Sequence, residues 1–197
     1  MDTHKRFAAC VMAMVAALLL TVNAAASDFI PICPPGLVRL PGREVYTSTT
    51  PPAELSPQFA PLDIPLDESL QYHAWTLAQY HEVPFEIVIA IMWVESRFEH
   101  ITAQEANGTV SVGRMQVNSV NHGWLYRDHG LDVNCPYENI SAGVLILAMY
   151  YNQFDDIERA VAAYNVGPSR ARRRYGTSYA RRVFERVKEL EGLTCVK

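Results

Sequence analysis

The sequence predicts one mainly α domain behind a proline-rich segment, and three observations lead to that fold class. Hydrophobic residues make up 49% of the 197 residues and charged residues 19%, so the chain can bury a core. From residue 67 onwards, hydrophobic residues recur at helical spacing between helix start and stop signals. Signals for β-strands are few, and no internal repeat is present.

Two helices are expected on either side of Pro84. Asp67 is a suitable N-cap for a helix over residues 68–82, because its carboxylate can accept hydrogen bonds from the first free backbone N–H groups. Pro84 suits the first turn of the second helix, since proline lacks the N–H that a helix start leaves unbonded. This helix carries the sequence IVIAIMWVES and is apolar nearly all round, which indicates a buried central helix.

The middle of the domain is expected to contain a loop and then a helix. Gly108 and Gly113 interrupt residues 102–114, which favours a loop there. The following stretch MQVNSVNHGWLY, residues 115–126, is expected to be helical. Only helices and loops are therefore predicted for this part of the chain.

Three further helices are predicted towards the C-terminus. Pro136 suits the start of a helix over NISAGVLILAMYYNQF. Asp155 and its acidic neighbour suit the start of IERAVAAYN, and Gly167 with the proline after it ends that helix. TSYARRVFERVKEL forms the last helix. The domain is expected to span residues 67–190, followed by a C-terminal tail of residues 191–197.

Residues 1–26 are expected to be a secretory signal peptide. Lys5 and Arg6 form a basic start, an apolar segment of about 16 residues follows, and three alanines before Ser27 offer a cleavage site. The apolar segment is short for a membrane span, which needs about 20 residues. An uncleaved membrane anchor is the alternative. Export to the periplasm, the cell envelope or the extracellular space is expected in either case.

The next segment, residues 27–66, holds nine of the chain's twelve prolines and the cluster TSTTPP. Such a composition is typical of an extended segment and not of a packed element. We therefore expect a linker, or a strap that lies on the domain.

Removal of the signal peptide would leave Cys33, Cys135 and Cys195. An oxidising compartment permits one disulfide among them, and the sequence does not decide which pair forms it. A bridge between Cys33 and Cys195 is preferred, because it would join the two ends of the domain. No spacing of cysteine and histidine suggests a metal site, and no cofactor is expected.

The formal net charge of −4 hides an asymmetry along the chain. Residues 27–168 are mostly acidic in their charges, whereas residues 169–197 are mostly basic. A basic segment could face an anionic polymer, but a solvated helix face explains it more simply and is preferred. Nothing in the segment indicates binding of nucleic acid, so no such partner is expected.

Glu95 lies near the C-terminal end of the predicted apolar helix. Burial and the negative end of the helix dipole both disfavour its charged form, so its pKa is expected to be raised. A carboxylic acid that stays protonated near neutral pH can donate a proton to a leaving group. Cleavage of a glycosidic bond needs such a donor, because the departing sugar oxygen leaves poorly without a proton. The alternative is an exposed glutamate paired with Arg97 or Arg114.

Five short motifs follow one another in the order VESRF, VGRMQVN, ENISAG, AAYNVGP and SYARRV. Their residues are Glu95, Ser96, Phe98, Gly113, Met115, Gln116, Asn139, Ile140, Gly143, Ala163, Tyr164, Asn165, Gly167, Pro168 and Tyr179. This series resembles the lytic transglycosylase family with an Slt-type, goose-lysozyme-like catalytic domain. The resemblance spans about half of the chain and implies a lysozyme-like fold for the single domain. Arg114 departs from the family pattern, in which a small or apolar residue is common before Met-Gln.

The resemblance implies that the substrate is peptidoglycan, cut between N-acetylmuramic acid and N-acetylglucosamine. Glu95 would be the sole acid/base: it would protonate the glycosidic oxygen and then take a proton from the muramic acid's own primary hydroxyl, which attacks the anomeric carbon. The product would be an anhydro-muramic end. Because the nucleophile belongs to the substrate, no second carboxylate is needed. Other acidic residues are therefore expected to be surface groups: Glu99, Glu105, Asp128 and Asp132.

The same resemblance assigns substrate-binding roles to six residues: Ser96, Met115, Gln116, Tyr164, Asn165 and Tyr179. The amide of Gln116 would bind N-acetyl or hydroxyl groups of a sugar, since it can both donate and accept hydrogen bonds. Met115 would form a wall beneath the sugar. The hydroxyl of Ser96 is expected either in the site or bonded only to its own helix.

The two tyrosines and the asparagine belong to the last helices of the domain. Tyr164 and Asn165 would line the site near Glu95. The hydroxyl of Tyr179 would steady the Glu95 carboxylate or the positively charged sugar of the transition state. Each tyrosine could instead belong to the core.

Two other functions stay open. In a lysozyme of related fold, water would attack and the product would be a reducing sugar. A cell-wall-binding or assembly protein would keep the fold without the chemistry, and Glu95→Gln would then leave wall lysis unchanged. Small single-domain members of the family often serve secretion or conjugation machinery, so such a partner is a further expectation, and we expect a monomer.

Overall fold

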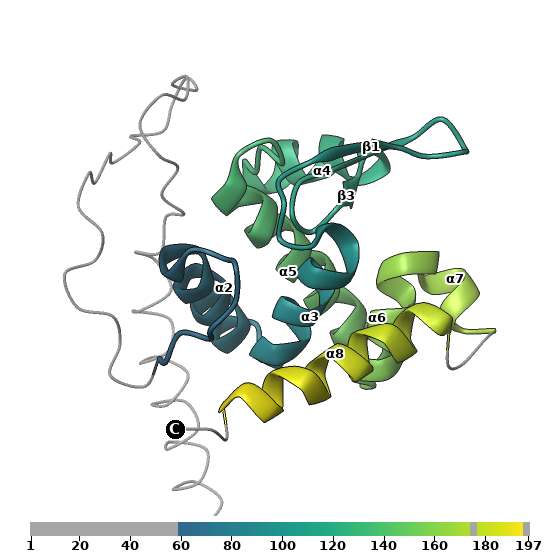
Figure 1. Cartoon of the computed structure of the whole chain (residues 1–197). Helices are drawn as coiled ribbons and strands as arrows, with labels where there is room; N and C mark the ends of the chain where they lie inside the picture. Colours follow the sequence, from purple (N-terminus) through teal and green to yellow (C-terminus); the bar gives the residue numbers. More distant parts are fainter. Residues whose placement is uncertain (1–58, 174–176, 195–197) are drawn as a thin grey trace, which may run out of the picture. The chain divides into compact units, whose positions relative to one another are not determined.

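The structure of the protein, a computed structural model, describes residues 59–173 and 177–194 and confirms the mainly helical fold (Figure 1). The helices are α2 (Glu68–Tyr80), α3 (Phe85–Ser96), α4 (Ser119–His129), α5 (Pro136–Phe154), α6 (Ile157–Val166), α7 (Pro168–Ala171) and α8 (Ser178–Thr194). The strands are β1 (Thr102–Gln104), β2 (Val110–Val112) and β3 (Val117–Asn118). None of the described helices is both long and apolar enough to cross a membrane. The predicted signal peptide lies outside the described residues.

Helix α3 lies among the other helices of the described part (Figure 1). It contacts α2 and α8, while α5 contacts α2 and α6. Every residue of α3 from Ile87 to Met92 is buried. A helix that is apolar all round is stable only in such a position, because its neighbours remove every face from water. The predicted buried central helix is therefore confirmed.

Helix boundaries follow the capping residues of the sequence. At the start of α6, the side chain of Asp156 accepts a hydrogen bond of 3.0 Å from the backbone N–H of Arg159. At the start of α4, Asn118 accepts one of 3.2 Å from the N–H of Val120. Asp67 occupies the N-cap position of α2 without a side-chain capping bond. Such caps satisfy N–H groups that a helix start leaves free.

Residues 102–118 form a small antiparallel sheet in the order β1-β2-β3, where the sequence analysis expected a loop followed by the start of a helix. Strands of two or three residues are too short to show a clear alternation of polar and apolar residues. One signal was present, an Asn-Gly pair at residue 107, which favours tight hairpin turns. Helix α4 begins only at Ser119, so Met115 and Gln116 lie in the turn between β2 and β3.

The packed domain extends beyond both predicted boundaries. Phe59 and Leu66, which the sequence analysis placed in the strap, are buried in the core. The side chain of Gln71 on α2 holds this segment: its Oε1 accepts from the N–H of Leu62 at 2.8 Å, and its Nε2 donates to the carbonyl of Leu66 at 2.8 Å. At the other end, α8 continues to Thr194, beyond the predicted end at residue 190. The domain thus includes the end of the strap and the start of the tail.

Cys135, immediately before α5, is fully buried and disulfide-bonded. The bridge that the sequence favours joins Cys33 and Cys195, two residues that lie outside the described part of the chain. Cys135 therefore takes part in a disulfide, whereas the favoured Cys33–Cys195 bridge does not include it.

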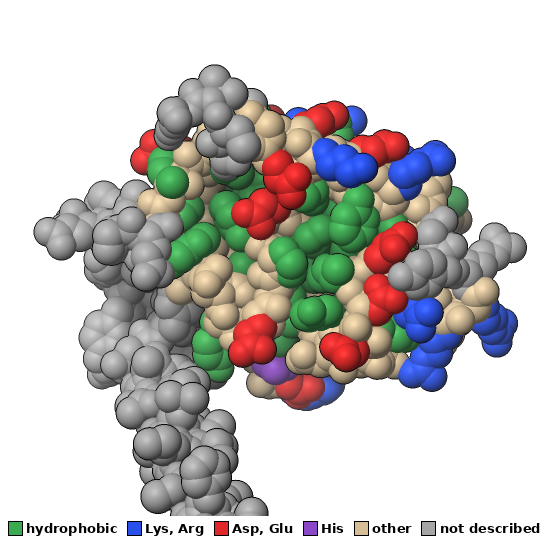
Figure 2. Space-filling model, turned by 90° about the horizontal axis from the view of Figure 1, so that it is seen from below, with side chains coloured by type: hydrophobic (Ala, Val, Ile, Leu, Met, Phe, Trp, Pro, Cys, Tyr) green, Lys and Arg blue, Asp and Glu red, His purple; other side chains and the backbone are tan. Residues whose placement is uncertain are grey.

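Charges of both signs lie on the described surface (Figure 2). In that view, Lys and Arg side chains gather towards the right-hand side, and Asp and Glu side chains are spread over the middle. Basic residues of α8 such as Arg181 and Lys188 are exposed. Their exposure supports the simpler explanation of the basic segment as a solvated helix face.

Candidate active site

Glu95 occupies the last turn of α3. The helix ends directly after it, because Arg97 and Phe98 adopt left-handed backbone conformations with φ values of 57° and 68°. Such values cost free energy in residues other than glycine. Packing compensates for that cost: Phe98 is buried, and the guanidinium of Arg97 lies 3.3 Å from the centre of the Trp93 ring. The chain turn leaves Glu95 partly buried at the edge of the core.

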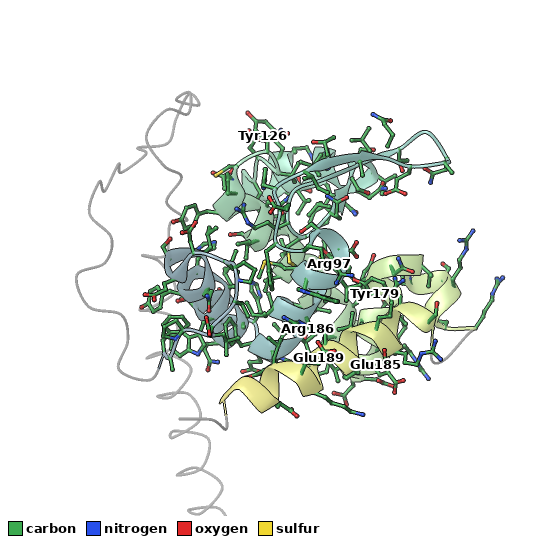
Figure 3. The ribbon with its side chains drawn as sticks, viewed as in Figure 1. Arg97, Tyr126, Tyr179, Glu185, Arg186 and Glu189 are labelled. Carbon is green, nitrogen blue, oxygen red and sulfur yellow. The ribbon has the colours of Figure 1, made fainter. Side chains whose placement is uncertain are left out.

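The surroundings of Glu95 raise the pKa of its carboxyl from an ordinary 4.5 to about 7. Burial is the largest cause, and the negative charge of Glu105 acts in the same direction. Two groups on α8 oppose the rise: the hydroxyl of Tyr179 donates a hydrogen bond of 2.7 Å to Oε1 of Glu95, and the positive charge of Arg182 favours the carboxylate. Figure 3 shows Tyr179 on α8 near the end of α3. The carboxyl can therefore exist in both protonation states near neutral pH.

Asn139 on α5 holds the turn that follows β2. Its fully buried side-chain oxygen accepts a hydrogen bond of 3.0 Å from the N–H of Met115. Its side-chain nitrogen donates to the carbonyls of Val112 at 2.8 Å and Val133 at 3.0 Å. Gly113 has a φ of 81°, and a Cβ built there would lie 2.2 Å from the Asn139 side chain, so only glycine fits. The VGRMQVN and ENISAG motifs thus form one packed unit.

Met115 connects that turn to two other motifs. Its side chain is fully buried, and a Cβ built on Gly143 of α5 would lie 2.6 Å from it. The hydroxyl of Tyr164 on α6 donates a hydrogen bond of 2.8 Å to the Met115 carbonyl. The family resemblance implies that Met115 forms a wall beneath a sugar. Because no part of it is exposed, it supports the neighbouring residues from behind.

Gln116 follows with a left-handed φ of 46°. Its Nε2 donates to the carbonyl of Gly113 at 2.7 Å and to that of Ile101 at 3.1 Å. Its Oε1 makes no hydrogen bond with any described residue and is free to accept one from a ligand. The side chain is partly exposed and fixed by backbone groups, which suits the predicted role in binding.

Of the predicted site residues on α6 and α8, the two tyrosines interact with Glu95, whereas Asn165 is exposed to solvent. Burial raises the pKa values of both Tyr164 and Tyr179 well above the ordinary range, and the negative charge of Glu95 adds to both shifts. Both hydroxyls therefore lie within electrostatic reach of the Glu95 carboxyl. Asn165 is exposed at the end of α6. Its side chain is available to a ligand next to Tyr164.

Ser96 makes structural hydrogen bonds, whereas the Arg114 side chain forms no ion pair with the described residues. The hydroxyl of Ser96 is buried and lies 3.1 Å from the carbonyl of Met92 and 2.9 Å from that of Arg114, so it joins α3 to the turn after β2. Glu99 acts on Arg114 through its charge, but no ion pair joins them in the described residues. The Nε and Nη1 atoms of Arg114 are buried and have no hydrogen-bond partner in the described part of the chain.

Glu105 is a residue that the sequence analysis did not place at the site. It belongs to none of the motifs and was expected to be a surface group. Its side chain is exposed, yet its charge acts on Glu95. The signal that could have located it is the Asn-Gly turn, since a hairpin brings the residue before the turn back beside the VGRMQVN motif.

Comparisons with known proteins bear on the family of this domain. A family profile described as "Transglycosylase SLT domain" matches residues 75–186. Among solved structures, the chain is similar to an inactive mutant of the lytic transglycosylase Slt from Pseudomonas aeruginosa, with 23% sequence identity and a TM-score of 0.44. That match covers 61% of this chain and 21% of the Slt chain. No curated protein matches the chain. Because the profile spans more than half of the sequence, the chain belongs to the transglycosylase SLT domain family, whose lysozyme-like, mainly helical fold it adopts.

Proposed function

We propose that the protein is a lytic transglycosylase that cleaves the β-1,4 bond between N-acetylmuramic acid and N-acetylglucosamine in peptidoglycan. Glu95 is its acid/base. The observation that carries this proposal is the partly buried Glu95 carboxyl, whose pKa of about 7 is balanced between burial and a hydrogen bond from Tyr179. A group with such a pKa can give up a proton and later take one back at neutral pH.

In the first half of the reaction, Glu95 gives its proton to the glycosidic oxygen. The bond between that oxygen and the anomeric carbon breaks, and N-acetylglucosamine leaves as an alcohol. Positive charge develops on the muramic acid ring while Glu95 becomes a carboxylate. The Tyr179 hydroxyl stabilises this carboxylate, because it donates a hydrogen bond to Oε1.

In the second half, the primary hydroxyl of the muramic acid attacks its own anomeric carbon. Glu95 removes the proton from that hydroxyl and returns to its starting state. The nucleophile is already tethered to the reacting carbon, so proximity replaces a second catalytic group. The product is a 1,6-anhydro-muramic end, and no water is consumed.

Two residues are proposed to bind the glycan strand directly. The free Oε1 of Gln116 accepts from an N–H or O–H group of a sugar, and Asn165 offers an exposed amide near Tyr164. Met115 and Ser96 act indirectly, because both are buried and hold the turn and the helix end in place. Peptidoglycan lies outside the cytoplasmic membrane, so the proposal also requires export, for which the predicted signal peptide provides a route.

Mass spectrometry of the fragments released from purified peptidoglycan tests this function. The wild-type protein is expected to release anhydro-muramic ends, and Glu95→Gln to release none. Glu99→Gln is the matched control, because Glu99 follows Glu95 by four residues, lies beyond the end of α3 and is exposed.

Each other result would point elsewhere. Reducing ends in place of anhydro ends would mean that water attacks, as in a lysozyme. Equal release by the wild type and Glu95→Gln would remove Glu95 from the chemistry. A protein that binds peptidoglycan without releasing fragments would support a wall-binding function.

A further inference from the structure

The three-stranded sheet has one apolar face and one polar face. Its register pairs Val112 with Val117 and Ser111 with Asn118. Paired residues share a face, and successive residues of a strand alternate between faces. Val112 and Val117 are buried in the core, so Ser111 and Asn118 point to the opposite side. This polar face is not needed for packing of the core.

Glu105 belongs to the polar face. Ala103 pairs with Ser111, and Glu105 follows two positions later, on the same side of the chain. The hydroxyl of Ser111 donates a hydrogen bond of 2.7 Å to Oε1 of Glu105. The amide of Asn118 in turn lies 3.4 Å from the Ser111 hydroxyl and donates a bond of 2.8 Å to the hydroxyl of Thr109. An exposed carboxylate is thus oriented by a chain of polar groups.

The backbone around Glu105 is also fixed. Its N–H donates to the carbonyl of Thr109 at 2.9 Å, and its carbonyl accepts from the N–H of Gly108 at 3.0 Å. The side chain of Asn107 accepts from both the N–H and the hydroxyl of Thr109, at 3.0 Å and 2.7 Å. These bonds close the hairpin turn directly after Glu105. Its carboxylate therefore has a defined position despite its exposure.

That position lies within electrostatic reach of Glu95. Among the residues that the structure describes, four charged or titratable groups interact with Glu95 from the elements around it. Glu105 comes from the hairpin, Tyr179 and Arg182 from α8, and Tyr164 from α6. Glu105 is the negative group of this set that disfavours an ionised Glu95, whereas Arg182 favours one. The two opposing charges lie on different elements and can be removed separately.

We propose that Glu105 is a positioning residue of the site: held by Ser111 on the polar face of the hairpin, its negative charge keeps the Glu95 carboxyl in the protonated form that starts the reaction. This inference rests on the proposed function. It gives the hairpin a role beyond connecting α3 to the Gln116 turn. It also explains why the polar face holds a carboxylate that the core does not need.

Direct titration of Glu95 tests the proposal. The protein is labelled with ¹³C at the glutamate carboxyls, and the Glu95 signal is assigned by its loss in Glu95→Gln. Glu105→Gln keeps the shape and the acceptor for Ser111 but removes the charge, so the pKa of Glu95 is expected to fall by about half a unit or more. The alkaline limb of the pH–rate profile should move to lower pH by the same amount.

Two further variants should change the pKa of Glu95 in opposite directions. Arg182→Gln removes the opposing charge and should raise the pKa of Glu95. Ser111→Ala keeps the Glu105 charge but frees its side chain, so the pKa of Glu95 should fall part of the way. Glu99→Gln is the control for a nearby carboxylate outside the polar face and should leave the titration unchanged.

An unchanged Glu95 titration in folded Glu105→Gln protein would overturn the proposal, as would an equal shift in Glu99→Gln. The titration needs no turnover, so the two proposals fail separately. Anhydro products with an unmoved Glu95 pKa would reject the role of Glu105 alone. A shifted pKa in a protein that releases no anhydro product would reject the reaction and keep the electrostatic coupling.

Discussion

The hydroxyl of Tyr179 donates a hydrogen bond of 2.7 Å to Oε1 of Glu95, although the two residues lie 84 positions apart in the chain. This bond joins the first turn of α8 to the last turn of α3. The acidity of Glu95 therefore depends on the packing of two helices as well as on local burial.

Replacement of Tyr179 by phenylalanine removes the hydrogen bond and keeps the ring. Because the bond favours the carboxylate, the pKa of Glu95 should rise above its present value of about 7. The alkaline limb of the pH–rate profile should move to higher pH. The rate near neutral pH should fall about tenfold or more, because the carboxylate that forms when Glu95 gives up its proton loses the hydrogen bond that stabilises it. Tyr126→Phe, at an exposed tyrosine of α4, is the control. A profile that coincides with that of the wild type would show that the bond has no part in the chemistry.

The stability of Glu95→Gln relative to the wild type should depend on pH. The folded-state pKa of Glu95 lies above its ordinary 4.5, so the folded protein holds a proton that the unfolded chain releases between pH 4.5 and about 7. The stability that Glu95 contributes below pH 4.5 is thus lost as pH rises towards 7. The stability of Glu95→Gln relative to the wild type should grow over this window and level off above it. The gain should reach about 3 kcal/mol before solvent screening reduces it. Urea titrations at several pH values measure it, and a difference that stays constant with pH would contradict the raised pKa.

Removal of the Asn139 side chain should loosen the turn that carries Gln116. Asn139→Ala leaves one backbone N–H and two carbonyls without their partner in a buried place, at a cost of about 3 kcal/mol or more. Asn152→Ala, at an exposed position of the same helix, should change stability by less than about 0.5 kcal/mol. Chemical denaturation compares the two variants. Equal stabilities would mean that water replaces the buried amide without loss.

A methyl group at position 143 should be poorly tolerated. The Cβ of Gly143→Ala would lie 2.6 Å from the Cβ of Met115, and rotation of the Met115 side chain cannot relieve that contact. Loss of about 1–3 kcal/mol is expected, as for other overpacked cores. Gly123→Ala on α4 meets nothing within 4 Å and should be neutral or stabilising. Thermal unfolding of both variants checks the pair, and a neutral Gly143→Ala would show that α5 can shift away from the turn.

The helices of the fold and several of their ends could be predicted from the sequence. The apolar run through Ile87 and Met92 indicated a buried helix, and Asp156 and Gly167 marked the two ends of α6. These signals are local, since each depends on hydrophobic spacing or on a capping group next to the helix. Glu95 could be singled out for the same reason, because an acidic residue stands out at the end of an apolar helix.

Features that depend on tertiary contacts could not be predicted in this way. The packing of Phe59 depends on partners from α2 and α3, so its proline-rich surroundings were misleading. Burial of Met115 depends on the absence of a side chain at Gly143. The effect of Glu105 on Glu95 needs the hairpin to fold back, and strands of two or three residues carry too little pattern to predict that.

The ring of Trp93 lies close to two guanidinium groups, with Arg97 at 3.3 Å and Arg186 at 4.6 Å from its centre. Figure 3 shows Arg97 at the end of α3 and Arg186 on α8. Indole emission responds to nearby cations, and this ring stands two positions before Glu95 on the helix that Tyr179 contacts. In a variant whose other two tryptophans are replaced by phenylalanine, the fluorescence of Trp93 reports on the distance between α3 and α8. Fluorescence could then follow, in real time, whether binding of a glycan strand increases or decreases the distance between the two helices.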